Sequence, residues 1–128
     1  MVNRAWTFCT VVAAIAVFCS SAYAQNAASG RDLARLHCSR CHVMPDLNNM
    51  GIGSTPSFKI MVLSKAEDWR AKFEAFFSLP PHPAFVTIKE LRTQRQGPSP
   101  IAPVILSLRD VDDLMAYVDE LAAEYRGK

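Results

Sequence analysis

Residues 37–42 read HCSRCH. Two cysteines separated by two residues occur in only a few kinds of site. Zinc sites, disulfides, redox dithiols and covalently attached haem all use this spacing. The choice among them depends on what surrounds Cys38 and Cys41, and on the role of His42, which follows the second cysteine directly.

The neighbouring sequence favours haem. Structural zinc needs four nitrogen or sulfur ligands, and tetrahedral ligation by the adjacent Cys41 and His42 is awkward. A thioredoxin-type dithiol lies within a βαβ pattern, whereas residues 30–37 (GRDLARLH) have a helical character and no strand-rich segment follows. In C-x-x-C-H, two thiols form thioethers to one haem and the adjacent histidine binds its iron. The sequence therefore predicts one haem c held by Cys38 and Cys41, with His42 as axial ligand, and leaves zinc and a dithiol as alternatives.

The N-terminus has the three parts of a secretory signal peptide. Arg4 supplies a basic start, residues 5–18 are apolar, and residues 22–24 (AYA) form an A-x-A cleavage site. A membrane anchor would need about 20 apolar residues, which is longer than the uninterrupted run here. We therefore predict a signal peptide at residues 1–24 and one exported domain, periplasmic in a bacterium, at residues 25–128.

Cysteine content and net charge indicate the compartment and the partners of this domain. Cys9 and Cys19 lie in the predicted signal, so the exported domain keeps two of the four cysteines. Covalent attachment would protect these two thiols in an oxidising compartment. The formal charge of +2 falls by one with Arg4, and basic residues alternate with acidic ones. We therefore expect no nucleic-acid partner and, after cleavage, no membrane association.

The exported domain resembles the class I c-type cytochromes over nearly its whole length. Besides C-x-x-C-H, the matching features are Gly30, residues 55–61 (TPSFKIM) and residues 113–118 (DLMAYV). The resemblance implies an all-α, small cytochrome c fold with three to four helices around one covalently bound haem. It also implies that Gly30 lets the first helix cross the last one closely. Finally, it implies that the Pro56 carbonyl accepts a hydrogen bond from His42, which would fix the tautomer of that ring and raise its basicity.

Local patterns predict two helices independently. Ser107, with Asp110 three positions later, resembles a capping box, and apolar residues then recur at helical spacing over about 15 to 17 residues. A second helix is expected to begin near Ser64 and to end before the two prolines at residues 80–81. It carries four aromatic residues whose simplest role is core packing: Trp69, Phe73, Phe76 and Phe77. Residues 45–55 and 80–103 are expected to be long non-helical segments.

The segment before the last helix lacks the methionine that binds the second axial position of the iron in electron-transfer members of this family. Two family patterns for that segment, P-H-P-x-M-P and M-P-x-x-x-L-S, read PHPAF and IAPVILS here, with Phe85 and Ile101 in the methionine places. No methionine occurs between Met61 and Met115. The expected ligand is therefore absent from its expected place.

Three states of the sixth position stay open. His82 is a possible sixth ligand, although the same histidine occurs in relatives that use the nearby methionine. An open or water-bound iron would leave Phe85 and Ile101 as an apolar distal wall that admits small neutral ligands; ordinary loop packing explains both residues equally well. The third possibility is another donor, such as Met50, whereas Met61 has the simpler role of filling the core.

The sequence favours an exported one-electron carrier, or the haem subunit of a redox complex, over an enzyme. The alternative is a haem protein with an open or weakly ligated sixth site that binds or senses a small ligand. Peroxidase-like catalysis would need a distal acid/base, for which His82 is the obvious candidate. Lys89, Arg92 and Arg95 form either a docking surface for an acidic redox partner or a solvated loop with ordinary charges.

Overall fold

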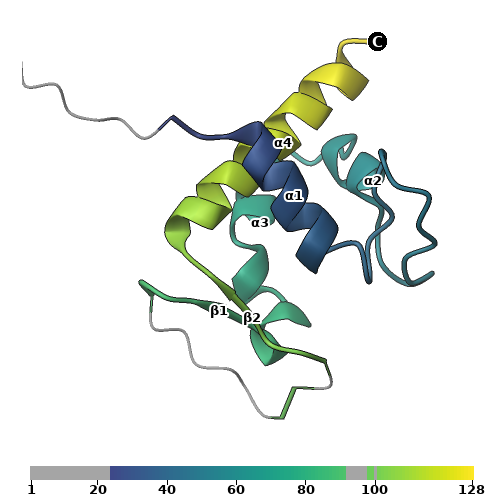
Figure 1. Ribbon diagram of the computed structural model, residues 1–128. Helices are drawn as coiled ribbons and strands as arrows, with labels where there is room; N and C mark the ends of the chain where they lie inside the picture. Colours follow the sequence, from purple (N-terminus) through teal and green to yellow (C-terminus); the bar gives the residue numbers. More distant parts are fainter. Residues whose placement is uncertain (1–23, 92–97, 100) are drawn as a thin grey trace, which may run out of the picture.

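The computed structural model describes residues 24–91, 98–99 and 101–128, which are mostly helical (Figure 1). The α-helices are α1 (Ala27–His37), α2 (Phe58–Val62), α3 (Trp69–Glu74) and α4 (Leu108–Arg126). The shorter elements are the 3₁₀ turns η1 (Phe76–Ser78) and η2 (His82–Ala84) and the strands β1 (Val86–Ile88) and β2 (Val104–Leu106). No helix in these ranges combines the length and the apolar character that a membrane span requires. The predicted signal peptide lies outside the described residues except for Ala24.

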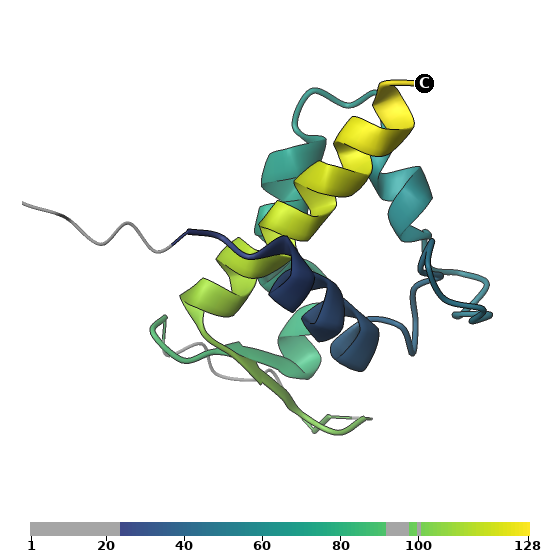
Figure 2. The same ribbon diagram turned by 45° about the horizontal axis from the view of Figure 1, so that its top comes forward.

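Helix α1 crosses α4 at close range (Figures 1 and 2). Gly30 of α1 lies against the backbone of α4: a Cβ at this position would overlap the Asp113 carbonyl and come within 2.9 Å of the Leu114 nitrogen. Only glycine permits this approach without moving a helix. The backbone N–H of Asn26 also donates to the buried Asp113 carboxylate at 2.8 Å. The predicted close crossing at Gly30 is confirmed.

Both terminal helices begin at capping side chains. The Asn26 side chain accepts hydrogen bonds from two backbone N–H groups in the first turn of α1. Ser107 and Asp110 form the predicted capping box at the start of α4, each side chain accepting from the backbone N–H of the other residue. Such bonds satisfy N–H groups that have no partner within the helix.

Helix α4 is 19 residues long and so exceeds its predicted length, because its last turn has partners elsewhere in the chain. Arg126 donates to the Val62 carbonyl at 2.6 Å, and its guanidinium lies 4.7 Å from the centre of the Trp69 ring. Two turns earlier, the Asp119 carboxylate accepts two hydrogen bonds of 2.9 Å from Arg70. These contacts hold α2 and α3 along the C-terminal half of α4.

Between the motif and α4, the structure differs from the sequence prediction in three places. The second helix runs only from Trp69 to Glu74 rather than from near Ser64 to just before residue 80, and Phe76 and Phe77 lie in η1. At its start, the Ser64 hydroxyl accepts the N–H of Ala66 at 3.3 Å and the chain turns there. Helix α2, capped by the Ser57 side chain, was not predicted. Residues 80–103, expected to be a non-helical segment, contain η2 and β1, and β2 begins directly after them at Val104.

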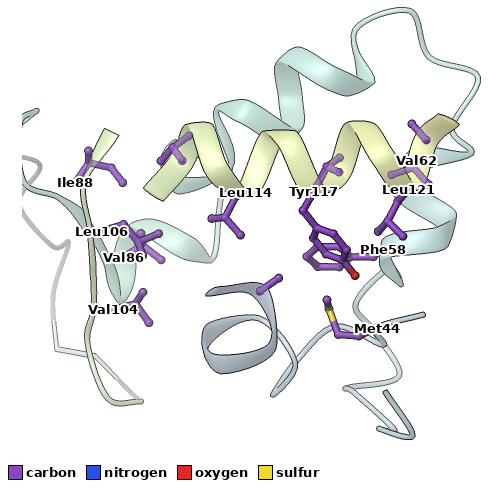
Figure 3. Close-up of a cluster of buried hydrophobic side chains, with 14 residues drawn as sticks. Met44, Phe58, Val62, Val86, Ile88, Val104, Leu106, Leu114, Tyr117 and Leu121 are labelled. Atoms are coloured by element: carbon purple, nitrogen blue, oxygen red, sulfur yellow. The ribbon is translucent and has the colours of Figure 1, made fainter. Parts of the chain in front are cut away.

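Strands β1 and β2 form a short parallel pair, with Val86 opposite Val104 and Ile88 opposite Leu106. All four side chains are buried and close the core at the N-terminal end of α4 (Figure 3). The fold is therefore mostly helical with one short strand pair, which is consistent with the predicted small cytochrome c fold.

The rest of the core lies along one side of α4. Leu114, Tyr117 and Leu121 point from this helix toward Phe58 of α2 and toward Met44 (Figure 3). The rings of Phe58 and Tyr117 have their centres 6.2 Å apart. This packing places α2, and with it the segment just before it, beside the C-x-x-C-H motif.

Candidate functional site

An apolar pocket of about 410 Å³ lies between the C-x-x-C-H motif and the chain from α3 to β2. Its walls are mostly aliphatic and aromatic side chains that the fold gathers from distant parts of the sequence. All of the candidate site residues predicted from the sequence line it: Cys38, Cys41, His42, Pro56, His82, Phe85 and Ile101.

The His42 ring is oriented by a backbone carbonyl. Its Nδ1 lies 2.7 Å from the Pro56 oxygen, and because a carbonyl only accepts, Nδ1 carries the proton. Nε2 then holds the lone pair that a metal requires. The ring also meets Phe58 edge-on, with centres 5.8 Å apart. The hydrogen bond between His42 and the Pro56 carbonyl is the one that the family resemblance implies.

Asn49 holds the backbone of the motif in place. Its side-chain Nδ2 donates to the carbonyls of Ser39 and His42, each at 2.8 Å. Its Oδ1 accepts the backbone N–H of Met44 at 2.9 Å. The sequence analysis missed this residue, because an asparagine in an irregular loop gives no local indication of its partners.

The loop after the motif is hydrogen-bonded to the backbone of the second cysteine, Cys41. The Thr55 hydroxyl donates to the Cys41 carbonyl, and the N–H of Ile52 donates to the same oxygen at 2.8 Å. Gly51 allows the chain to return, since its φ of 58° is a conformation that other residues rarely adopt. The motif is therefore held by the loop on its C-terminal side as well as by α1.

The two cysteines are free thiols beside the pocket. Burial raises the pKa of the Cys38 thiol to about 12, and a smaller electrostatic effect of Cys41 adds to the rise. A redox dithiol has the opposite property, because its reactive thiol has a lowered pKa. In the part of the chain that the structure describes, no three His, Cys, Asp or Glu side chains are grouped as metal ligands. The described residues therefore give no support to a redox dithiol or to a protein-ligated zinc ion at this site.

His82 lines the same pocket from η2. Its Nδ1 lies 3.0 Å from the Leu79 carbonyl oxygen, so Nδ1 again carries the proton and Nε2 the lone pair. Burial, the largest cause, lowers the pKa of His82 below its ordinary value. The planes of the His42 and His82 rings are 7° from parallel, and their centres are 6.2 Å apart.

Phe85 and Ile101 both line the pocket, but Phe85 also supports His82. The Phe85 ring is centred 5.7 Å from the His82 ring at an angle of 57°. Phe76 approaches His82 edge-on from another direction, with centres 5.3 Å apart. The aromatic residues of this region therefore hold a histidine ring as well as forming an apolar wall.

The methionines are mostly placed away from the pocket. Met44 and Met115 are buried in the core at 1% and 3% exposure, whereas Met50 is 92% exposed. Met61 does line the pocket, but it belongs to α2, which follows the Pro56 segment that orients His42. Among the described residues, Met61 is thus the one methionine in reach of a group bound in the pocket.

Comparison with known proteins identifies the family. No protein-family model and no solved structure matches the chain. The chain is 35% identical over 99 residues to cytochrome c-552 of Bradyrhizobium diazoefficiens. The match covers 77% of this chain and 90% of that protein, so it extends over nearly the whole of the relative. The chain belongs to the c-type cytochromes.

Proposed function

We propose that this chain is an exported, monohaem class I cytochrome that transfers single electrons, as a carrier or as the haem subunit of a redox complex. Residues 1–24 direct export, and residues 25–128 form the cytochrome domain. Cys38 and Cys41 attach one haem c, and His42 binds its iron. The name of the relative, cytochrome c-552, supports a covalent haem and electron transfer in this family.

The observation that carries this proposal is the orientation of His42 at the edge of an apolar pocket. Pro56 accepts the Nδ1 proton at 2.7 Å, which leaves Nε2 as a basic donor. Cys38 and Cys41 line the same pocket, and two thiols at this spacing suit thioether bonds to one porphyrin. The apolar walls fit a large flat ligand better than a hydrated ion.

A bound haem supplies an iron that gains or loses one electron. The residues of the chain set the conditions for that exchange. The hydrogen bond from His42 to Pro56 strengthens the imidazole as a donor. The apolar walls exclude water, and a low dielectric favours the oxidation state with the smaller net charge.

Electron transfer is preferred to ligand sensing and to peroxidase-like catalysis because of the space opposite His42. Both alternatives need a free coordination position there. The His82 ring, centred 6.2 Å from that of His42 and nearly parallel to it, crowds this position. We therefore propose a redox protein rather than an enzyme.

The proposed partner is another redox protein, met in the periplasm or another exported compartment. Lys89 is exposed at the end of β1, where a basic side chain suits an acidic partner. Arg92 and Arg95, the other two basic residues considered for docking, lie outside the described residues.

The test is redox titration of the complete chain, expressed in a bacterium that attaches haem c. We expect haem that stays with the protein on a denaturing gel and a single reversible one-electron transition in a spectroscopic potentiometric titration. Protein that carries covalent haem but is not reversibly reduced and reoxidised would contradict electron transfer. Protein without covalent haem would contradict the whole proposal.

A further inference from the structure

We propose that Nε2 of His82 occupies the sixth position of the haem iron, so that this cytochrome has two histidine ligands in place of histidine and methionine. The inference rests on the proposed haem site and adds the residue that closes it. It also replaces the open site that the missing methionine leaves possible.

The relative placement of the two rings is the first support. Two imidazoles that bind one metal atom from opposite sides, with bonds of about 2 Å each, have ring centres about 6 Å apart. The centres of His42 and His82 are 6.2 Å apart and their planes deviate from parallel by 7°. The pocket therefore already holds the rings at the separation that one shared iron requires.

The tautomers are the second support. Pro56 accepts from Nδ1 of His42, and Leu79 accepts from Nδ1 of His82. Each hydrogen bond fixes the proton on the nitrogen that faces backbone, so both Nε2 atoms are lone-pair donors in one pocket. A ligating histidine characteristically donates its other ring N–H to a carbonyl or carboxylate. His82 has this arrangement as fully as His42 does.

The surroundings of His82 restrict its movement, which favours a role as an iron ligand over chance proximity to His42. Prolines flank the histidine on both sides and restrict the backbone of η2. Phe76 and Phe85 contact the ring from two directions. Because the side chain is already confined, binding a metal costs little further conformational entropy.

Other donors in the pocket are less well placed. Met61 belongs to α2, directly after the Pro56 segment, and so lies on the His42 side. His37 precedes Cys38 directly, and its short connection to that attachment point keeps it at the edge where the haem would be anchored. Both residues line the pocket and provide matched control positions.

The inference predicts the behaviour of the iron. With two strong nitrogen ligands, the haem should be six-coordinate and low-spin in both oxidation states, and ferrous protein should not bind carbon monoxide. Methionine ligation raises the potential of a cytochrome c, so a histidine in its place should give a lower one. A chain with His82→Met should therefore have a higher potential than the wild type.

The experiment compares absorption spectra of the exported, haem-loaded wild type with those of His82→Ala, Met61→Leu and His37→Asn. We expect a high-spin ferrous spectrum that shifts under carbon monoxide only for His82→Ala, and a return to the low-spin spectrum when imidazole is added to it. A His82→Ala protein that stays low-spin and does not bind carbon monoxide would overturn the inference. So would a Met61→Leu or His37→Asn protein that is no longer low-spin.

A measurement on the wild type alone keeps the inference testable if His82→Ala does not fold. Near-infrared magnetic circular dichroism of the ferric protein distinguishes two histidine ligands from histidine and methionine, and a histidine–methionine or high-spin signature would overturn the proposal. A haem-stained denaturing gel tests covalent haem attachment separately from the role of His82. Stained wild type with an open iron contradicts only the role of His82, whereas unstained wild type contradicts the haem site as well.

Discussion

Asn49 connects the backbone of the C-x-x-C-H motif to the loop that follows it. One side chain satisfies two carbonyls and one N–H, and two of these groups belong to Ser39 and His42 within the motif. A buried or partly buried carbonyl that loses its donor costs more than the average hydrogen bond contributes. The position of His42 therefore depends on a residue that never touches the pocket.

The Asn49→Ala exchange is predicted to lower the free energy of unfolding of the haem-loaded protein by about 2–3 kcal/mol, because three hydrogen bonds are lost together. Urea denaturation followed by far-ultraviolet circular dichroism measures this change. The neighbouring, exposed Asn48 provides the control, since Asn48→Ala should change stability by less than about 0.5 kcal/mol. Equal effects of the two exchanges would show that Asn49 has no special role.

The identities of single residues in the site were only partly predictable. Their spacing singled out Cys38, Cys41 and His42, and the surrounding sequence favoured haem among the chemistries that share this spacing. His82 stood out as the remaining histidine of the distal segment, but its ring separation from His42 depends on how η2 packs. Partners such as Asn49 were not predictable, since their hydrogen bonds depend on the path of a loop.

At the scale of elements, the crossing of α1 and α4 fixes where the motif begins. Gly30 brings the two backbones together, and the N–H of Asn26 adds a bond of 2.8 Å to Asp113. Seven residues after the crossing, α1 ends and Cys38 follows at the edge of the pocket. A shift of α1 along α4 would therefore move both thiols.

Gly30→Ala is predicted to destabilise the haem-loaded protein by about 2 kcal/mol or more, because the added methyl group overlaps the Asp113 carbonyl and the helices must separate. Thermal unfolding monitored by circular dichroism provides the measurement. Gly53→Ala is the matched control, because no atom lies within 4 Å of a Cβ at that position. Unchanged stability of Gly30→Ala would contradict the close crossing.

Local signals explain which elements were predictable. The capping box at Ser107 and the apolar spacing of α4 lie within one segment, so they could be read from the chain directly. The strands could not, because each has three residues and pairs across the long segment between Ile88 and Val104. The short helix α2 lacks the repeated turns that periodicity requires.

At the scale of the whole molecule, the pocket of about 410 Å³ lies inside a domain of modest size and borders its core. Side chains from α1, α3, β1, β2 and α4 all reach it. A small domain buries too little surface to be very stable by itself. A haem in the pocket would therefore form part of the core as well as the redox centre.

The double exchange Cys38→Ser/Cys41→Ser is predicted to remove covalent haem and to lower the free energy of unfolding by about 3 kcal/mol or more, because apolar walls lose their packing partner. Denaturant unfolding of the purified variant, compared with the haem-loaded wild type, measures the loss. Equal stability of the two proteins would mean that the fold does not need a group in the pocket.

If one haem is attached to an exported domain through Cys38 and Cys41, the intact mass of the exported protein under denaturing conditions shows it directly. We expect the mass of residues 25–128 plus one haem. We also expect no haem on Cys38→Ser/Cys41→Ser and full attachment on Cys9→Ser/Cys19→Ser. A wild-type mass without haem would show that the two cysteines do not attach one.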